Sequence, residues 1–579
     1  MRALRRTACA VVLALAVTAG CSSAPSDAPD ASPDTSPSAS PSLVPSVEAE
    51  PPRAVEDPSA KVPPTRPNIV MVLVDDMSME LLQTMPQVQR MIRRGASYPS
   101  SYVVDSLCCV SRTSLLTGQY PHQTGVRTNT SNLPNPEGAV GGFTAFREYG
   151  NEQRAVNVRL QKAGYATGYV GKFLNEYEPK LFASGAPPAP PGWTSWNVLF
   201  GNAYDGWDFD SSEVVDGQLR LRHHPAPPSW ATGREKDAGY AGTVTEQLAL
   251  DFIREHQPRK DPYFLVVAPY APHSRTDPRG HYPGDPWFPA AFRDRPGPGK
   301  GLGNCGAVPC GELGVDDLPG YGDDVSDNVP VYADGSPARE WRSPMGGLPA
   351  KAAASDLRNR ARMLQSVDRM VARIRATVDD DTVVVFSSDN GYHLGQHGLG
   401  SGKGSPYDVD VRVPLVVVGP GIAPGERPEL TSNIDLAATF EELAGLEPAA
   451  YRAGRSLVPS LRRERHRVRK AVVIEHTWGP TLSSDPDRPL GRQPLEHIPS
   501  YVAARSETGL LVRVDLDNDP VATDHAWEFY DLTTARYERT NVHADPAYAD
   551  EIAALKREIA RFDRCSRHVR DAAVPDRCR

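Results

Sequence analysis

The chain has 579 residues, of which 40% are hydrophobic and 23% are charged, and its formal net charge is −9. This length favours one large domain with an appendage, and the mild acidity argues against nucleic-acid binding, which usually needs a basic field. No run of the roughly 18 apolar residues that span a bilayer occurs, so no transmembrane helix is predicted. What remains is a body of enzyme size that can still be tethered to a membrane.

The first 21 residues have the pattern of an export signal. A basic start, Met1-Arg-Ala-Leu-Arg-Arg, precedes a largely apolar run from Ala8 to Ala19 and then Gly20-Cys21. The string Val17-Thr-Ala-Gly-Cys21 resembles a bacterial lipobox, in which Cys21 would carry lipid and become the mature N-terminus. The alternative is an ordinary signal that is cleaved nearby. We expect an exported bacterial protein, either a cell-surface lipoprotein or secreted, that reaches the membrane only through a lipid anchor at Cys21.

Residues 22–65 predict a disordered linker. Proline recurs at every fourth position from Pro25 to Pro45, among Ser, Ala and Asp. Such a segment buries too little apolar surface to offset the entropy lost on ordering. The folded body therefore begins after residue 65.

The cysteines of an exported protein can be sorted by their spacing. Four of them form two close pairs that predict local disulfides. These pairs are Cys305 with Cys310 and Cys565 with Cys578. Cys108 and Cys109 are adjacent in sequence and have no other partner left, so two thiols in an oxidising compartment call for a chemical explanation.

Residues 66–455 predict a doubly wound α/β domain with a large, mainly parallel sheet flanked by helices. Short apolar runs have the length and composition of buried parallel strands. The runs are Asn68–Val74, Tyr263–Val267, Thr382–Phe386 and Pro414–Val418. A helical pattern places Leu364, Val367, Val371 and Ile374 on one face before the third run. Alternating strands and helices place ligands at the carboxyl ends of the strands.

Polar residues follow three of these runs directly. Asp75 and Asp76 follow the first run, His273 follows the second, and Asp389 with Asn390 follows the third. A single Asp-Asp pair is as consistent with a helix cap or a turn as with a site. Several such groups at one sheet edge favour a site.

Residues 456–579 predict a smaller C-terminal α+β domain. Short strands near 471–474, 501–505, 510–514 and 527–530 precede a helix opened by Asp545-Pro546, with Ile552, Leu555, Ile559 and Phe562 on one face. A Gly-, Pro- and Asp-rich insertion from Thr276 to Met345 lies after His273 and is either a substrate lid or a surface excursion.

One stretch is similar to a known family signature. Leu107-Cys-Cys-Val-Ser-Arg-Thr-Ser-Leu-Leu-Thr-Gly118 resembles the Cys-x-Pro-Ser-Arg…Leu-Thr-Gly signature of type I sulfatases. The resemblance extends from Arg66 over nearly all of the remaining chain. It is strongest to N-acetylglucosamine-6-sulfatases and extracellular heparan endosulfatases, through Gly171–Tyr177, Pro190–Trp193 and Gly402–Pro414. It implies an alkaline-phosphatase-like fold.

The resemblance implies that Cys108 is the precursor of formylglycine (3-oxoalanine), because Arg112 stands four residues later. Cys109 fails this test and is expected to be a buried free thiol. The hydrated aldehyde would supply one hydroxyl that attacks sulfur and a second that expels sulfate. A formylglycine-generating enzyme would be required for maturation. Val110 replaces the Pro of the modification signal.

Further roles follow from the same resemblance. One Ca²⁺ ion would be held by Asp75, Asp76, Cys108, Asp389 and Asn390, since carboxylate and amide oxygens suit this ion. Arg112 would steady the aldehyde, Lys172 and Lys403 would hold sulfate oxygens, and His273 would protonate the departing sugar oxygen. Asn175 and His393 are weaker candidates for substrate contact. His393 and its neighbour His397 are as consistent with a structural role.

The predicted function is therefore a calcium-dependent exported sulfatase that acts on sulfated carbohydrate of the glucosamine-6-sulfate type. An alternative in the same superfamily is a phosphodiester or phosphonate ester hydrolase, because the same metal site suits phosphoryl groups. Another alternative is an unmatured, non-catalytic lipoprotein that binds sulfated glycans. Val110 supports this alternative, because it replaces the Pro of the modification signal.

Overall fold

The computed structural model describes residues 66–131, 140–178, 189–215, 218–342, 347–464, 468–479, 485–488, 498–518, 525–535, 537–565, 572–575 and 578. The predicted signal at 1–21 and the predicted linker at 22–65 lie outside these residues. All described residues belong to one compact unit, Ser59–Arg579. Within them, no helix has both the length and the apolar character needed to cross a membrane.

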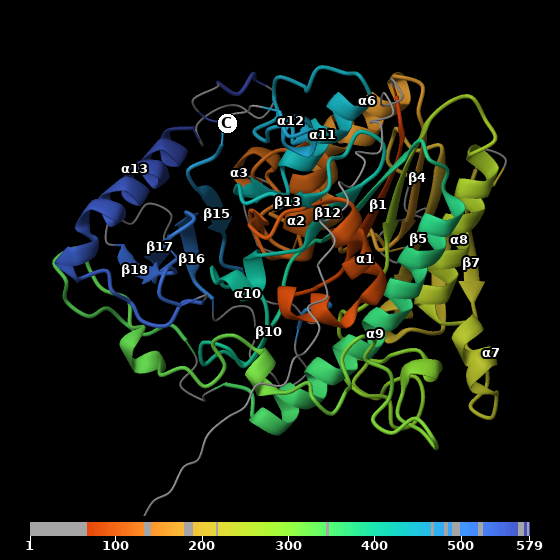
Figure 1. The fold of residues 1–579 in the computed structure, drawn as a ribbon, viewed down its shortest axis with the longest axis horizontal. Helices are drawn as coiled ribbons and strands as arrows, with labels where there is room; N and C mark the ends of the chain where they lie inside the picture. Colours follow the sequence, from red (N-terminus) through yellow and green to blue (C-terminus); the bar gives the residue numbers. More distant parts are fainter. Residues whose placement is uncertain are drawn as a thin grey trace, which may run out of the picture. The chain divides into compact units, whose positions relative to one another are not determined.

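A ten-stranded mixed sheet organises the large part of the molecule (Figure 1). Its order is β13-β2-β12-β9-β1-β8-β4-β5-β6-β7. The strands are β1 (Asn68–Val74), β2 (Ala96–Ser97), β4 (Ala166–Gly171), β5 (Ser195–Gly201), β6 (Phe209–Val215), β7 (Gln218–His224), β8 (Tyr263–Ala268), β9 (Thr382–Ser388), β12 (Leu415–Val418) and β13 (Gly425–Glu426). The central strands β9, β1, β8, β4 and β5 are all parallel. The predicted mainly parallel α/β fold is confirmed.

One strand prediction was wrong in direction. The run that ends at Val418 forms β12, which pairs antiparallel with β9. An apolar run shows that a strand is buried on both faces, but the direction in which it enters the sheet depends on the connection before it.

Helices cover both faces of this sheet (Figure 1). Along β1, Ile69, Met71 and Leu73 pack in one core, whereas Val70, Val72 and Val74 pack in the other. The first core contains residues of α2 (Cys108–Thr117), α4 (Gly142–Glu148), α6 (Val156–Lys162), α11 (Asp435–Leu443) and α12 (Val458–Leu461). The second contains residues of η1 (Met79–Thr84), α1 (Pro86–Arg94), α8 (Ala241–His256) and α9 (Ala350–Thr377). This alternation is the reason that β1 reads as a continuous apolar run.

The remaining short elements connect these layers. The helices are α3 (Pro121–Thr124), α5 (Asn151–Arg154), α7 (Gly233–Ala238), α10 (Asp408–Val411), η3 (Asn202–Asp205), η4 (Phe292–Asp294), η5 (Val315–Asp317) and η6 (Val325–Asp327). Two further ladders pair β3 (Ser101–Tyr102) with β14 (Thr431–Ser432) and β10 (His393–Leu394) with β11 (Ser401–Gly402).

A separate four-stranded antiparallel sheet follows near the C-terminus (Figure 1). Its strands are β15 (Val472–His476), β16 (Ser500–Arg505), β17 (Gly509–Asp515) and β18 (Ala526–Asp531), and they precede η8 (Pro546–Tyr548) and α13 (Ala549–Cys565). Helix α13 covers one face through Ile552, Leu555 and Ile559. The other face packs against residues of the large part, such as Tyr102 and Tyr407. The predicted small α+β element is confirmed; the boundary at 455/456 stays a prediction.

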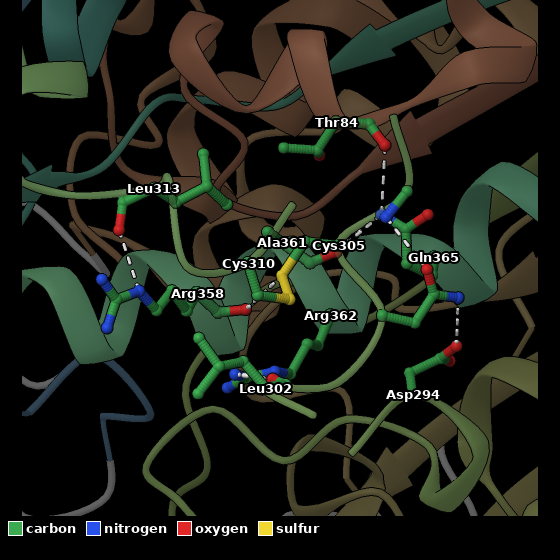
Figure 2. The surroundings of a disulfide bond; sticks show 12 residues. Thr84, Asp294, Leu302, Cys305, Cys310, Leu313, Arg358, Ala361, Arg362 and Gln365 are labelled. Atoms are coloured by element: carbon green, nitrogen blue, oxygen red, sulfur yellow. Dashed lines mark hydrogen bonds between the residues drawn. A yellow bond between two sulfur atoms is a disulfide. The ribbon is translucent and has the colours of Figure 1, made fainter. Parts of the chain in front are cut away.

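The insertion after His273 packs against α9 (Figure 2). The predicted disulfide between Cys305 and Cys310 lies in it, and both cysteines belong to the core that α9 lines. Arg358 of α9 donates a hydrogen bond of 2.8 Å to the carbonyl of Leu313 in the insertion. The second predicted disulfide, Cys565 with Cys578, is also present. These contacts fix this part of the insertion on α9, and its role as a substrate lid or a surface excursion stays a prediction.

A buried charge joins the insertion to the small sheet and to the segment that opens α10. The carboxylate of Glu528 in β18 is fully buried and accepts a hydrogen bond of 3.0 Å from Arg342, which is itself buried. Trp341 also donates to it at 2.8 Å, Tyr407 at 3.0 Å and Tyr530 at 2.9 Å. Full satisfaction of a buried charge is what makes its burial tolerable.

Glu528→Ala is expected to lower the free energy of unfolding by about 3–5 kcal/mol. It removes the buried acceptor of three other donors and leaves the buried Arg342 guanidinium with Glu340, which is 32% exposed, as its remaining carboxylate. Denaturant unfolding followed by circular dichroism measures this change. Glu213→Ala breaks the ion pair with the 62% exposed side chain of Arg222 and serves as the control. The control should cost less than about 1 kcal/mol. Equal effects of the two substitutions would contradict the structural role of Glu528.

Candidate active site

The carboxyl ends of four parallel strands meet at one edge of the large sheet. Asp75 and Asp76 follow β1, Lys172 follows β4, and Asp389 follows β9 directly. His273 comes five residues after the last residue of β8, Ala268. Parallel strands present their carboxyl ends together, which is why residues far apart in sequence converge here.

Lys172 owes its position to a close approach of two backbones. Gly171 has φ of +103°, and a Cβ placed there would lie 2.0 Å from the carbonyl oxygen of Ala268. The amide of Lys172 donates a hydrogen bond of 2.7 Å to that same oxygen. Only glycine permits both features, so the strand end turns Lys172 into the site.

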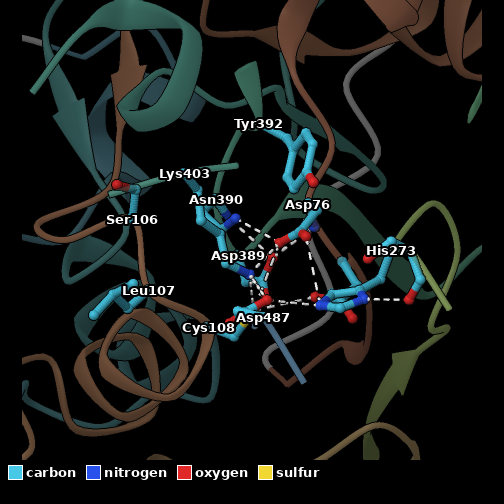
Figure 3. A network of polar contacts seen from close by, with 12 residues as sticks. Asp76, Ser106, Leu107, Cys108, His273, Asp389, Asn390, Tyr392, Lys403 and Asp487 are labelled. Carbon is cyan, nitrogen blue, oxygen red and sulfur yellow. Dashed lines mark hydrogen bonds and ion pairs between the residues drawn. The ribbon is translucent and has the colours of Figure 1, made fainter. Parts of the chain in front are cut away.

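Helix α2 brings Cys108 to this edge. Cys108 is the first residue of the helix and is fully buried. Its Sγ lies 3.6 Å from Oδ1 of Asp76 and 2.7 Å from Nζ of Lys403 (Figure 3). It also lies 3.4 Å from Oδ1 of Asp75. Burial, and then the charge of Asp389, raise the pKa of the Cys108 thiol well above its usual value. The unmodified side chain is therefore a neutral thiol here, not a thiolate nucleophile.

Arg112 stands one helical turn after Cys108 and faces the same cluster. Its Nε donates to Oδ2 of Asp389 at 2.8 Å, and its Nη1 donates to the carbonyl oxygen of Lys172 at 2.8 Å. Nη2 lies 3.7 Å from Oδ1 of Asp75. The guanidinium thus connects the ends of three strands from a position that is 1% exposed.

Two lysines and a histidine supply the remaining positive charge. Nζ of Lys172 lies 2.7 Å from Asp75, and Nζ of Lys403 lies 2.7 Å from Asp76. Burial disfavours each ammonium, but the adjacent carboxylates outweigh it and raise the pKa of both lysines. Both side chains are therefore cations at neutral pH.

His273 is held at both ring nitrogens. Nδ1 lies 2.7 Å from the carbonyl oxygen of Ser274, which only accepts, so Nδ1 carries a proton. Nε2 lies 2.8 Å from Oδ1 of Asp487 and 3.6 Å from Oδ2 of Asp76. Burial disfavours the imidazolium, yet the charges of Asp76 and Asp75 outweigh burial and raise the pKa of His273.

The donor atoms of the cluster fit a divalent cation. One oxygen from each of Asp75, Asp76 and Asp389 and the sulfur of Cys108 all lie within 4.8 Å of one another. Among the described residues, the buried atoms Asp76 Oδ2 and Asn390 Oδ1 have no hydrogen-bond partner. Burial raises the pKa of Asp75 although Lys172 opposes it, so a bound cation would favour the charged form of this carboxyl. Hard oxygen ligands with unused lone pairs are what Ca²⁺ prefers.

The two weaker candidates lie at the margin of this cluster. Asn175 is 6% exposed, and neither its Oδ1 nor its Nδ2 has a partner among the described residues. It lines a pocket of about 300 Å³ together with Lys172 and Tyr204. Nδ1 of His393 lies 2.9 Å from Oδ2 of Asp410, which is a contact outside the cluster.

Sequence reasoning missed two carboxylates and an amide that the structure brings to the site. Asp487 reaches Nζ of Lys403 at 2.8 Å, and Asn129 donates a hydrogen bond from Nδ2 to Oδ2 of Asp487. Burial, and then the charge of Asp487, raise the pKa of Asp485 to about 7. No motif or strand end marks these positions, so the sequence alone offered no signal for them.

Comparison with known proteins gives a consistent assignment. The model of the sulfatase family matches residues 67–446. The extracellular sulfatase SULF-1 homolog of Drosophila melanogaster is 30% identical over 411 residues, which are 68% of this chain and 31% of that protein. The chain thus spans about a third of that relative's length.

Two further proteins extend the comparison. N-acetylglucosamine-6-sulfatase of Homo sapiens is 29% identical over 438 residues, 73% of this chain and 70% of that protein. A solved structure of a protein in complex with its substrate D-glucosamine-2-N,6-O-disulfate has a TM-score of 0.58 at 19% identity, covering 86% of this chain and 98% of its own, and shares the fold. Because the family model covers most of the chain, the protein belongs to the sulfatase family, a family of sulfuric ester hydrolases.

Proposed function

We propose that the protein hydrolyses sulfate esters of carbohydrates at the cluster around Cys108. The observation that carries this proposal is the position of Cys108. Cys108 is the first residue of α2, and Arg112 lies on the same face of this helix. The side chain of Cys108 lies between the Asp75–Asp76 pair and Lys403. Family membership and the Cys108…Arg112 spacing support oxidation of Cys108 to formylglycine. As its hydrate, formylglycine supplies an oxygen nucleophile and a second hydroxyl that lets sulfate leave.

The cations of the cluster counter the negative charge of the sulfate ester, which is the main obstacle to its hydrolysis. The ester is an anion that repels an incoming nucleophile, and Lys172 and Lys403 are placed to bind its oxygens. Arg112 donates to Asp389 and to the backbone carbonyl of Lys172. Its guanidinium therefore holds these groups in position and does not itself neutralise the charge of the ester. Nε2 of His273 carries the proton that the departing sugar oxygen needs.

One Ca²⁺ would be held by Asp75, Asp76, Asp389, Asn390 and residue 108. When bound, it supplies positive charge opposite an anionic ester. The unused oxygens Asp76 Oδ2 and Asn390 Oδ1 support this ligand set. Maturation in this proposal requires a formylglycine-generating enzyme, with Val110 in the place of the usual Pro.

A sugar of the glucosamine-6-sulfate type is the proposed substrate. Relatives named N-acetylglucosamine-6-sulfatase and extracellular sulfatase support this class. The pocket beside Lys172 has aromatic walls, Phe200, Tyr204 and Tyr270, and one buried amide, Asn175. Apolar rings with a few fixed polar groups are typical of small-ligand sites.

Asn175→Ala is expected to raise KM for a sulfated monosaccharide by about tenfold, because two hydrogen-bonding atoms that face the pocket are lost. The turnover number kcat should change by less than about threefold. Asn197→Ala is the control, since Asn197 is half-buried on β5 and bonds Ser195 at 3.0 Å. Equal KM values for the Asn175 and Asn197 variants would remove Asn175 from the substrate pocket.

Export is also proposed. Relatives named as extracellular and the two disulfides support it. Cleavage after the signal at 1–21 and lipidation of Cys21 remain part of this proposal. Metabolic labelling with a fatty acid tests the anchor: label should be lost in Cys21→Ala.

Mass spectrometry of the peptide that contains Cys108 tests the function most directly. Protein from the native host should carry an aldehyde there and should turn over sulfate esters with Ca²⁺ present. An intact thiol and no turnover would favour the glycan-binding alternative. Turnover of phosphodiesters or phosphonate esters alone would favour the other alternative in the superfamily.

A further inference from the structure

The carboxylate of Asp487 occupies the place where the cations of the site converge. Its side chain is 4% exposed. Oδ1 lies 2.8 Å from Nε2 of His273 and 2.8 Å from Nζ of Lys403 (Figure 3). Oδ2 accepts a hydrogen bond from Nδ2 of Asn129. Three donors from three separate elements thus point at one anion.

The partners of the other carboxylates explain why this place is open to an anion. Asp75 pairs with Lys172, and Asp389 pairs with Arg112. Lys403 is shared between Asp76 and Asp487. The imidazolium of His273 is left with Asp487 as its nearest carboxylate, at 2.8 Å against 3.6 Å for Asp76.

The geometry of Asn129 is that of a fixed donor. It is 2% exposed, and its Oδ1 accepts a hydrogen bond of 3.1 Å from the amide of Cys109 on α2. This bond sets the orientation of the amide, so Nδ2 must point away from the helix. Nδ2 points at the same carboxylate that His273 and Lys403 hold.

The contact of His273 with Asp487 conflicts with the role proposed for His273. Nδ1 is engaged by the carbonyl of Ser274, so Nε2 bears the only proton available for a leaving oxygen. That proton faces Asp487. A substrate therefore has to take the place of this carboxylate before His273 can act.

We infer that the Asp487 carboxylate stands in for the sulfate group in the substrate-free protein, and that Asn129 is a ligand of the sulfate ester together with His273 and Lys403. This inference rests on the proposed function and deepens it. Asp485 shapes the local turn, since its Oδ1 accepts a hydrogen bond of 3.0 Å from the amide of Asp487 two residues later. Exchange of one anion for another leaves the charge of the site unchanged.

Binding of inorganic sulfate, measured by isothermal titration calorimetry on the full, Ca²⁺-supplied protein, tests this inference without turnover. Asn129→Ala should weaken sulfate binding by roughly 10- to 100-fold, the loss expected for a hydrogen bond to a charged group. Asp487→Ala should tighten it by about tenfold, if the carboxylate fills the place about nine-tenths of the time. The two variants must move the affinity in opposite directions.

Asp294→Asn is the matched control. Asp294 is a fully buried carboxylate of the insertion whose ion-pair partner is Arg369, at 2.7 Å. The sulfate affinity of this variant should stay within about twofold of the wild type. Asn129→Ser, checked for its melting temperature, replaces Asn129→Ala if the latter does not fold.

Other results overturn the inference. Unchanged or weaker sulfate binding in Asp487→Ala means that the carboxylate does not fill the anion position. A fall in kcat of that variant with unchanged sulfate affinity assigns Asp487 to positioning His273 instead. Unchanged sulfate affinity in a folded Asn129 variant removes Asn129 as a ligand. Opposite shifts of affinity in a protein that turns over no sulfate ester would uphold the inference and refute the proposed function.

Discussion

Cys108→Ala is expected to abolish hydrolysis of sulfate esters while the protein stays folded. Loss of a covalent nucleophile costs on the order of 10⁶-fold in kcat. The thiol of Cys108 is buried among Asp75, Asp76 and Lys403, and burial keeps it neutral. An unmodified thiolate at this position therefore does not replace the proposed aldehyde as the nucleophile. Initial rates with a sulfated monosaccharide and near-ultraviolet circular dichroism measure both parts of the prediction.

Cys109→Ala is the matched control for this experiment. Cys109 is equally buried, neighbours Cys108 on α2 and belongs to the apolar core beneath the sheet. Its replacement should cost about 1 kcal/mol of stability through a small cavity and leave kcat within about twofold. Loss of activity in both variants together with loss of the fold would show that Cys108 is a structural cysteine.

Asp76→Asn is expected to lower the affinity for Ca²⁺ by on the order of 100-fold or more, because a charged oxygen ligand becomes a neutral one. The backbone of Asp76 has φ of +62°, a region that Asn tolerates better than most residues, so the substitution is not expected to strain the chain. A wild-type protein at 100 times its Kd for Ca²⁺ gains about 2.7 kcal/mol of stability. The rise of the melting temperature on adding Ca²⁺ should be lost in the variant, and kcat at low Ca²⁺ should fall with it.

Asp294→Asn provides the control for removing a buried carboxylate. Asp294 is fully buried in the insertion and pairs with Arg369 at 2.7 Å, away from the proposed metal ligands. This variant should lose stability but keep the full response of its melting temperature to Ca²⁺. An unchanged Ca²⁺ response in Asp76→Asn would show that Asp76 is not a metal ligand.

Much of the central fold could be predicted because its signals are local. The run Asn68–Val74 is apolar at every position after the first, since successive side chains enter two different cores. The face of α9 that contains Leu364, Val367 and Val371 was readable from the helical period. Strand β4 gave no such signal, because it contains Gly168 and Gly171 among few apolar residues.

The candidate site was predictable to the extent that chemistry-bearing residues follow strands or share a helix face. Cys108 and Arg112 are four residues apart, so a helix brings both to one side. Asp75, Asp389 and His273 follow runs that a parallel sheet ends at a common edge. These relations need the element type, which local sequence indicates, and the parallel direction that alternating strands and helices favour.

The sequence by itself determined the sulfatase signature, the strand ends that carry its polar residues and the small sheet with its covering helix. Only the tertiary structure decided that β12 runs antiparallel, that the insertion lies along α9, and that Asp487 and Asn129 enter the site. The physical reason is that these features depend on contacts between segments distant in the chain. Asp487 lies 214 positions from His273, and no pattern of hydrophobicity or spacing records such a pairing.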